Sequence, residues 1–297
     1  MEIGIIVPQG WTGEYDGWTT EAAWSRTMAV ASQAERLGFE SLWVFDHFQT
    51  VPRPTDEITF ESFTLLAALA MATRRVRLGH LVMCTGYRNP ALVAKMICTL
   101  DAMSHGRMEL GLGAGWKRDE WLAYGYGFPQ TRERLALLSD HLEILARMLA
   151  PGRGDHATFE GRLAAVHDAI NVPKPVQAHL PVMVGGNGRT VTWRLAAQHA
   201  DELNLDGLSP EEGAEALPVI RERWAEAGRD PATVRVSVHL WWGDPARSRA
   251  ERVERLVAYR ELGVARTMEL VRTAATDDDA LEAYAADCRA AGCVLAA

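Results

Sequence analysis

Short apolar runs and longer amphipathic segments alternate along the whole chain. Short runs of apolar or β-branched residues predict buried strands, and segments with apolar residues three and four positions apart predict helices. We expect strands over residues 3–7, 41–45, 76–82, 108–113, 181–184, 201–205, 234–240 and 264–270. We expect helices over residues 21–37, 60–73, 89–106, 130–149, 189–199 and 210–228, a further one that ends at residue 263 and a last one through residue 290. About eight strand–helix units in one chain are typical of a (β/α)8 barrel, which is a TIM barrel.

Capping residues mark the boundaries of these units. Thr20 and Asn89 each stand at the start of a predicted helix, where a side-chain oxygen can accept a backbone N–H. Two segments interrupt the alternation: residues 114–129 after the fourth strand, and residues 151–180, where we expect a small hairpin. No linker divides the chain, so we expect one domain over residues 1–297 with two insertions.

A doubly wound open sheet with a dinucleotide site is a rival interpretation. It rests on Gly111, Gly113 and Gly115, which resemble the glycine-rich phosphate loop of that fold. However, the spacing is G-x-G-x-G, the motif follows the fourth strand, and the Trp-Lys-Arg-Asp that comes next is a poor entry to a tight helix. We therefore favour the barrel.

Two titratable residues follow the second predicted strand. The segment SLWVFDHFQ, residues 41–49, runs from an apolar strand directly into Asp46 and His47. The carboxyl ends of barrel strands form one face, where active sites lie, so we expect both residues on that rim. A neutral imidazole there can transfer a proton or donate a hydrogen bond. The alternative is that His47 caps Asp46 or a loop and has no chemical role.

The segment VMVGGNGRT, residues 182–190, predicts a strand that runs into three glycines and then a helix. Glycines let the backbone approach a ligand closely, and the N–H groups at a helix N-terminus bind anions. Three glycines in four residues are more than one turn requires, which favours a phosphate site. The alternative is a tight turn that needs only positive φ angles.

Tryptophan is concentrated in the loops at the expected rim. Six of the ten tryptophans fall there, namely Trp11, Trp18, Trp116, Trp121, Trp241 and Trp242. A pocket for a flat ring requires aromatic walls of this kind. Ordinary packing of long loops explains one or two of these residues more easily than six.

Composition narrows the class of protein. A formal net charge of −8 argues against a general nucleic-acid binder. The sequence contains no run of 18 apolar residues, so we expect no membrane span. The sequence opens on a strand pattern without a basic leader, and the four cysteines have neither metal nor redox spacing. We therefore expect a cytoplasmic, reduced protein.

Three segments together resemble the luciferase-like flavin and deazaflavin oxidoreductases. They are VFDHFQ (residues 44–49), LGHLVMCTGYRNPALVAKMICTLDAMSHGRMELGLGAGW (residues 78–116) and PVMVGGNG (residues 181–188). The resemblance extends over residues 1–295, and Asp-His-Phe-Gln is most similar to members that use the deazaflavin coenzyme F420. It implies a (β/α)8 barrel with both insertions, and homodimers are common in the family.

The resemblance also implies roles for individual residues. Asp46 and His47 would border the cofactor ring, with His47 as the proton-transfer group oriented by Asp46. Leu81–Val82 would be a non-prolyl cis peptide beside the ring. Contacts with the ring edge would come from Cys84 and Thr85, and contacts with the cofactor phosphate from Val184, Gly185, Gly186, Asn187 and Gly188. The substrate pocket would be lined by Trp11, Trp116, Trp121 and Trp241, and we expect no metal site.

Two departures from the family pattern bear on the substrate. Members that oxidise phosphorylated glucose carry a glutamate where this chain has Trp116, and a lysine after the sixth strand where this chain reads Leu-Asp-Gly-Leu, residues 205–208. These differences disfavour a sugar phosphate, and the apolar Trp116 favours a flatter, less polar substrate.

The leading hypothesis is an oxidoreductase that transfers a hydride to or from F420. The second is an FMN-dependent monooxygenase that uses O2 and needs a flavin reductase as partner. A metal-dependent hydrolase on the same barrel ranks lower, because its convergent His and carboxylate ligands are missing from the strand ends. A cofactor carrier without catalytic activity is a fourth alternative.

Overall fold

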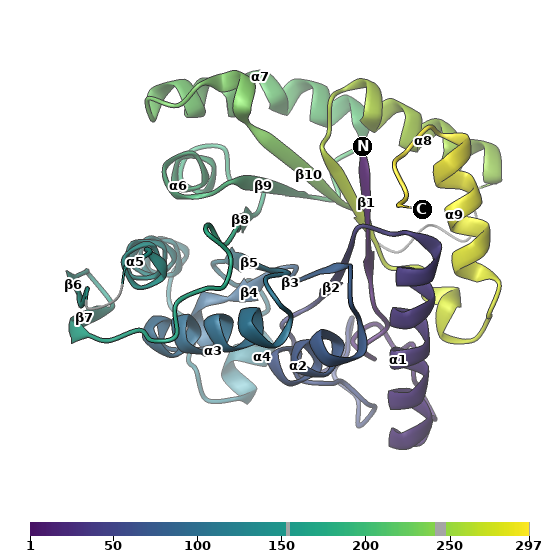
Figure 1. Ribbon diagram of the computed structural model, residues 1–297, viewed down its shortest axis with the longest axis horizontal. Coiled ribbons are helices and arrows are strands. Elements are labelled where there is room, and N and C mark those ends of the chain that lie inside the picture. The colour runs from purple at the N-terminus through teal and green to yellow at the C-terminus, as the bar shows by residue number, and fades with distance from the viewer. Residues whose placement is uncertain (153–154, 241–247, 297) are drawn as a thin grey trace.

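Eight parallel strands close into a barrel surrounded by helices, in a computed structural model that describes residues 1–152, 155–240 and 248–296 (Figure 1). The hydrogen-bonded order is β3-β2-β1-β11-β10-β9-β8-β5, and pairing of β3 with β5 closes the ring. The strands are β1 Glu2–Ile6, β2 Ser41–Val44, β3 Arg77–His80, β5 Met108–Gly113, β8 Val182–Gly185, β9 Glu202–Asp206, β10 Arg235–Leu240 and β11 Arg266–Glu269. The predicted (β/α)8 barrel is confirmed, and a closed ring excludes the open doubly wound sheet.

Helices cover the outside of the barrel. They are α1 Thr20–Leu37, α2 Ser62–Ala72, α3 Pro90–Met103, α4 Arg118–Ala123, α5 Thr131–Leu149, α6 Thr192–His199, α7 Pro210–Glu226, α8 Arg249–Glu261 and α9 Ala280–Ala290. Single turns of 3₁₀ helix lie at Thr85–Tyr87, Pro231–Thr233 and Arg272–Ala275. In the described part of the chain, no helix is both long and apolar enough to cross a membrane.

Both insertions contain structure of their own. The first holds α4, which the sequence did not predict, and a short extra strand, β4 Met83–Cys84, pairs with β5 near this point. The second holds the expected hairpin, β6 Ala157–Glu160 and β7 Ala165–Ala169, which projects beyond α5 (Figure 1).

The helix caps follow from local chemistry. Asn89 caps α3 as expected, because its side chain accepts the N–H groups of the first turn. At α1 the capping residue is Thr19, not Thr20, and its hydroxyl accepts from Ala22 N. The error is one residue, since two adjacent threonines offer the same chemistry.

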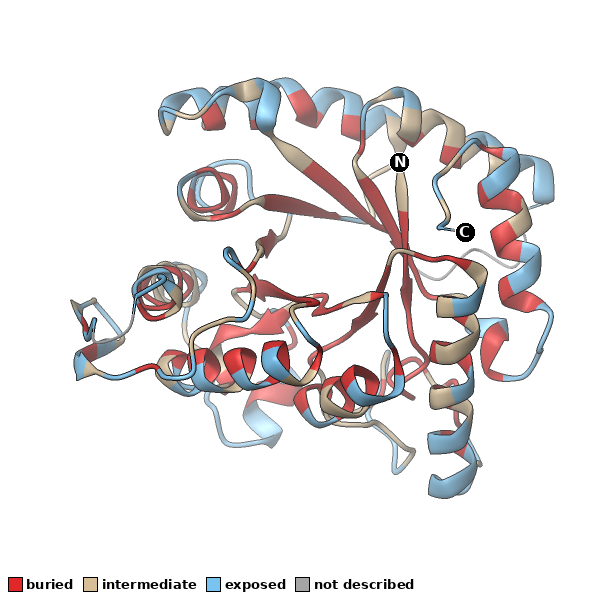
Figure 2. Ribbon diagram, viewed as in Figure 1, coloured by how far each residue is buried: buried red, intermediate tan, exposed pale blue. Residues whose placement is uncertain are grey.

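Apolar side chains fill two regions of the barrel. One cluster lies between the barrel strands and the helices, so most residues of the barrel strands are buried and the helices bury the face toward the barrel (Figure 2). A second cluster fills the barrel interior and includes Trp43, Met183 and Met268. The interior is therefore packed, and a ligand site must lie at an end of the barrel.

Charged residues occupy the amino-terminal end of the barrel. The Arg266 guanidinium is buried and lies 2.8 Å from Glu109, 3.0 Å from Glu202 and 3.0 Å from Glu40. These partners come from different parts of the ring, so one cation joins several strands. We call Arg266 and these three glutamates the amino-end cluster.

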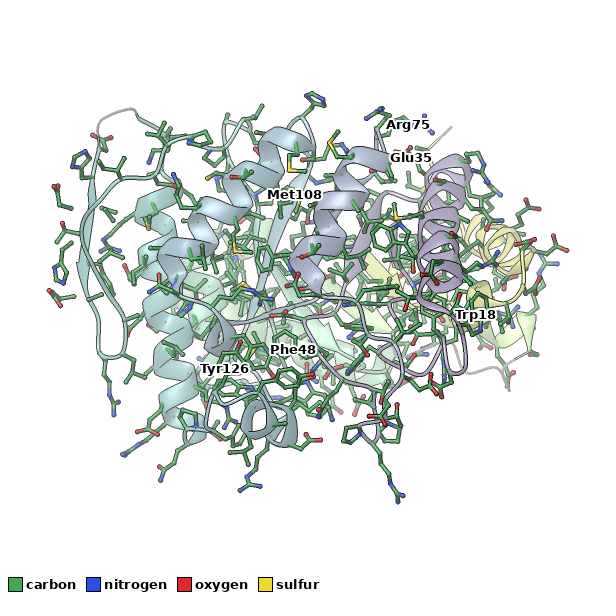
Figure 3. All side chains as sticks on the ribbon, turned by 90° about the horizontal axis from the view of Figure 1, so that it is seen from below. Trp18, Glu35, Phe48, Arg75, Met108 and Tyr126 are labelled. Carbon is green, nitrogen blue, oxygen red and sulfur yellow. The ribbon has the colours of Figure 1, made fainter. Side chains whose placement is uncertain are left out.

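The two ends of the barrel are distinct. Phe48 and Tyr126 lie together at the carboxyl end, with ring centroids 6.2 Å apart, whereas Glu35 and Arg75 lie at the opposite end (Figure 3).

Candidate active site

A pocket of about 280 Å³ opens at the carboxyl ends of the barrel strands. Its walls are Trp11 after β1, Phe45–His47 after β2, Leu81–Cys84 after β3, Tyr87, Gly113–Lys117 after β5, Gly185, Gly186 and Thr192 after β8, Asn204 and Asp206 on β9, and His239 on β10. His47 and Gly186 therefore line one pocket, as the sequence predicted from two segments far apart in the chain.

His47 is held on several sides. Its Nδ1 lies 2.7 Å from Oε2 of Glu120. The Trp11 ring stacks on the imidazole at 4.3 Å between centroids with an interplanar angle of 3°, and the Trp116 ring meets it edge-on at 5.8 Å. The imidazole therefore has one defined orientation in the pocket wall.

Asp46 does not orient His47, which corrects the prediction. Arg88 binds both carboxylate oxygens of Asp46 at 2.7 and 2.9 Å, and Ser62 Oγ and the Cys84 N–H donate to them at 2.8 and 2.9 Å. Burial would raise the pKa of Asp46, but Arg88 outweighs burial and holds this pKa below its usual range. The carboxylate fixes the chain around the pocket wall, with no bond to the imidazole.

Glu120, which was not predicted as a site residue, is the acid that contacts His47. Its side chain is fully buried and accepts the backbone N–H groups of Phe48 and Gln49 at 2.7 and 3.2 Å and the Tyr87 hydroxyl at 2.8 Å. Burial would raise the pKa of Glu120, but the hydrogen bond with His47 and these donors hold it below its usual range. Glu120 lies on α4, inside a segment that we had interpreted only as a long loop.

The backbone N–H groups of the glycine-rich turn after β8 lie in different environments. Gly185 and Gly186 line the pocket, and Gly186 has a φ of 132°, which favours glycine. The Gly186 N–H already donates to the Asn204 carbonyl at 3.0 Å. The N–H groups of Asn187 and Gly188, in contrast, have no acceptor among the described residues.

Two of the predicted phosphate contacts have side chains that are engaged elsewhere. The Val184 side chain is buried in the core outside the pocket. The Asn187 amide joins two loops, since its Nδ2 donates to the Asp206 carbonyl at 2.8 Å and its Oδ1 accepts from Asp206 N at 2.9 Å. An anion at this turn would therefore be bound by backbone N–H groups rather than by these side chains.

Only some of the residues predicted to contact the cofactor ring line the pocket. Leu81 and Val82 line the pocket and their peptide bond is cis, as expected. Cys84 lines the pocket as well, and burial raises the pKa of its thiol. The Thr85 hydroxyl instead donates to the Gly113 carbonyl at 3.2 Å, and Thr85 is not a pocket residue.

The predicted tryptophans occupy different environments. Trp11 is buried in the wall, and Trp116 is 61% exposed at the mouth. Trp121 is buried behind the wall and packs on Tyr87 and Phe128, at 5.4 and 5.6 Å between ring centroids, so its prediction as a pocket residue is corrected. Trp241 lies outside the described residues.

Further polar residues line the pocket from β9 and β10. Burial lowers the pKa of His239 to about 3, so this imidazole is neutral. Its Nδ1 lies 3.7 Å from the Asp206 carboxylate, and Asn204 is buried beside it. His239 was not predicted as a site residue because it lies within β10 and not after its end.

Side chains that could ligate a metal ion are not clustered in the described residues. Within residues 1–152, 155–240 and 248–296, no three His, Cys, Asp or Glu side chains are grouped so that they could hold a metal ion. The pocket offers an imidazole and aromatic walls, and the N–H groups of Asn187 and Gly188 follow the lining residue Gly186 along the chain; together these suit a flat anionic organic ligand.

A family model of luciferase-like monooxygenases matches residues 1–291. The chain therefore belongs to the luciferase-like monooxygenase family and is an oxidoreductase.

Relatives within the family differ in their activities. The F420-dependent glucose-6-phosphate dehydrogenase of Intrasporangium calvum is 33% identical over 70% of this chain and 67% of its own length. The pyrimidine monooxygenase RutA of Rhizobium rhizogenes is 28% identical over 77% of this chain and 64% of its own length. Among solved structures, an F420-dependent secondary alcohol dehydrogenase with an F420–acetone adduct superposes with a TM-score of 0.70, at 24% identity over 99% of this chain and 85% of that one. This structural likeness supports the shared fold.

Proposed function

We propose that this protein transfers a hydride between coenzyme F420 and a flat or apolar organic substrate, and that His47 moves the accompanying proton. The observation that carries the proposal is that His47 and the glycine-rich turn line the same pocket. The relative from Intrasporangium calvum, named as F420-dependent, supports the choice of cofactor.

The residues present fit a flat anionic cofactor. Leu81, Val82 and Cys84 would contact its ring, and the N–H groups of Asn187 and Gly188 would bind its phosphate. When bound, a deazaflavin supplies two-electron hydride transfer, because carbon replaces nitrogen at its reactive position. The protein's part is to orient the ring, exclude water and hold a proton at His47.

The pocket walls favour an uncharged substrate over a phosphorylated one. The Asp206 carboxylate lines the pocket near His239, at 3.7 Å from its Nδ1. Trp11 and Trp116 supply aromatic surface on either side of His47. Sugar phosphates, the substrates named for the Intrasporangium relative, therefore fit poorly.

An FMN-dependent monooxygenase is the second candidate. It is favoured by the similarity to pyrimidine monooxygenase RutA over 77% of this chain. The same glycine turn and aromatic walls would accept FMN, and the protein would then need reduced flavin from a partner reductase.

Fluorescence titration with F420 and with FMN tests the cofactor. Trp11 lies in the pocket wall, so quenching of tryptophan emission should report binding of either ring. Saturable binding of F420 at micromolar or lower concentration, with much weaker binding of FMN, supports the proposal. Tight binding of FMN alone reverses the order of the two candidates, and binding of neither contradicts both.

A further inference from the structure

We infer that Glu120 is a positioning residue that holds His47 in its Nδ1–H tautomer, so that the unprotonated Nε2 faces the pocket. The tautomer follows from the contacts of the two side chains alone. Its catalytic consequence rests on the proposed function, in which His47 exchanges a proton with the substrate.

The hydrogen bonds around Glu120 show that it is a carboxylate. Oε1 accepts two backbone N–H groups, from Phe48 and Gln49, and an amide N–H can only donate. Oε2 lies 2.8 Å from the Tyr87 hydroxyl and 2.7 Å from His47 Nδ1. Burial raises the pKa of Tyr87, so its hydroxyl keeps its proton and donates. A carboxyl with this many donors is ionised.

An ionised carboxylate accepts hydrogen bonds and cannot donate one. The hydrogen between Glu120 and His47 therefore resides on Nδ1. In a neutral imidazole only one nitrogen carries hydrogen, so Nε2 is left with its lone pair. Among the described residues, none forms a hydrogen bond with His47 Nε2.

The surroundings direct Nε2 toward the pocket. Glu120 is fully buried and is not a lining residue, whereas His47 lines the wall and its side chain is 12% exposed. Since Nδ1 is turned to the buried carboxylate, the opposite edge of the ring meets the pocket. The stacked Trp11 prevents the ring from tilting out of this orientation.

This arrangement gives His47 a defined role. In the oxidative direction Nε2 would accept the proton that the substrate loses, and in the reductive direction Nε2–H would return it. The bound cofactor would supply the two-electron chemistry. A carboxylate that fixes the tautomer of a catalytic histidine can contribute about 10⁴-fold in turnover.

Replacing Glu120 with glutamine tests the tautomer, because the two side chains have the same shape. The glutamine oxygen can still accept the two backbone N–H groups, which leaves its NH₂ facing His47. Nδ1 must then accept, so the hydrogen moves to Nε2. Tyr87→Phe is the matched control, since it removes one donor to Glu120 without reaching His47.

The measurement is ¹⁵N NMR of histidine-labelled, cofactor-free protein at about pH 8.5, where an ordinary imidazole is neutral. The His47 signals are identified by their loss in His47→Gln. We expect at least about a tenfold preference for Nδ1–H in the wild type and in Tyr87→Phe, and a predominance of Nε2–H in Glu120→Gln.

Two results would overturn the inference: Nε2–H in the wild-type protein, or an unchanged tautomer in folded Glu120→Gln. The wild-type spectrum decides even if Glu120→Gln does not fold. Titration of the same samples with F420 separates the two proposals. A protein with the expected tautomer that binds neither cofactor contradicts the proposed function and leaves the positioning role of Glu120 intact.

Discussion

Replacing Arg88 with leucine tests whether Asp46 has a structural rather than a catalytic role. Arg88 makes two charge-assisted hydrogen bonds to the buried Asp46 carboxylate. Without them, Asp46 keeps only the Ser62 hydroxyl and the Cys84 N–H as donors. Removing one partner of a buried ion pair costs about 3–5 kcal/mol, because the remaining charge is left uncompensated.

Urea denaturation followed by circular dichroism measures this loss. Arg194→Leu is the control, since Arg194 is half exposed and pairs with Glu226 at 3.3 Å on the surface. We expect Arg88→Leu to lower the free energy of unfolding by about 3–5 kcal/mol, and Arg194→Leu by less than about 1 kcal/mol. A double variant that adds Asp46→Asn should recover part of the loss, because no buried charge then remains.

The same pair predicts a pH dependence with a definite sign. The pKa of Asp46 is lowered in the folded protein, so its ionised form stabilises the fold above the unfolded pKa of about 3.9. This stability is lost as pH falls through the lower folded value. In Arg88→Leu the pKa of Asp46 rises toward or above its unfolded value, so this acid-dependent loss of stability should shrink or disappear. Equal losses for Arg88→Leu and Arg194→Leu at neutral pH would refute the reasoning.

Three further substitutions separate the parts of the site. His47→Ala should lower the rate of hydride transfer by about 10²–10⁴-fold and leave the cofactor affinity unchanged. The rate is measured from F420 absorbance in stopped flow, and an unchanged rate would remove His47 from the mechanism. Gly188→Ala places a Cβ 2.6 Å from Thr192 Oγ1 and should weaken F420 binding, measured by titration, about tenfold. Gly213→Ala is the control, because the nearest atom to its Cβ is 3.6 Å away, and it should leave the affinity unchanged. Equal affinities of the two variants would contradict an anion site at the turn. Trp121→Ala should cost about 3–5 kcal/mol of stability by urea denaturation, because it empties a buried site behind the wall; a loss under about 1 kcal/mol would show that Trp121 does not support the wall.

The barrel was predictable because its strands are buried on both faces. Each apolar run could be recognised without knowledge of its partners, and the observed strands overlap the predicted ones. Boundaries were less certain where two residues offered the same cap, as at the start of α1. The short helix α4 was missed because six residues carry too little periodicity to be distinguished from a loop.

The location of the site could be predicted from the sequence, but most of its side-chain contacts could not. Strand ends converge on one face, which brought His47, Leu81, Val82 and Gly186 together correctly. The partner of His47 could not be found in this way. Neighbouring residues in an extended segment point in opposite directions, so Asp46 turns away from the ring that follows it.

Long-range pairing explains what was missed. Glu120 lies 73 positions after His47 along the chain, and only the folded loop brings the two together. Trp121 was misplaced for the related reason that its neighbour Glu120 points toward the imidazole while Trp121 packs behind the wall. No local pattern in the sequence distinguishes these two directions.

The amino-end cluster has a consequence for substrate entry and product release. Arg266 and its three glutamates occupy one opening of the barrel, and the packed interior lies above them. In the described part of the chain, small molecules thus have no passage along the barrel axis. Among the described residues the pocket opens at the carboxyl ends of the strands, so substrate entry and product release would share that end of the barrel.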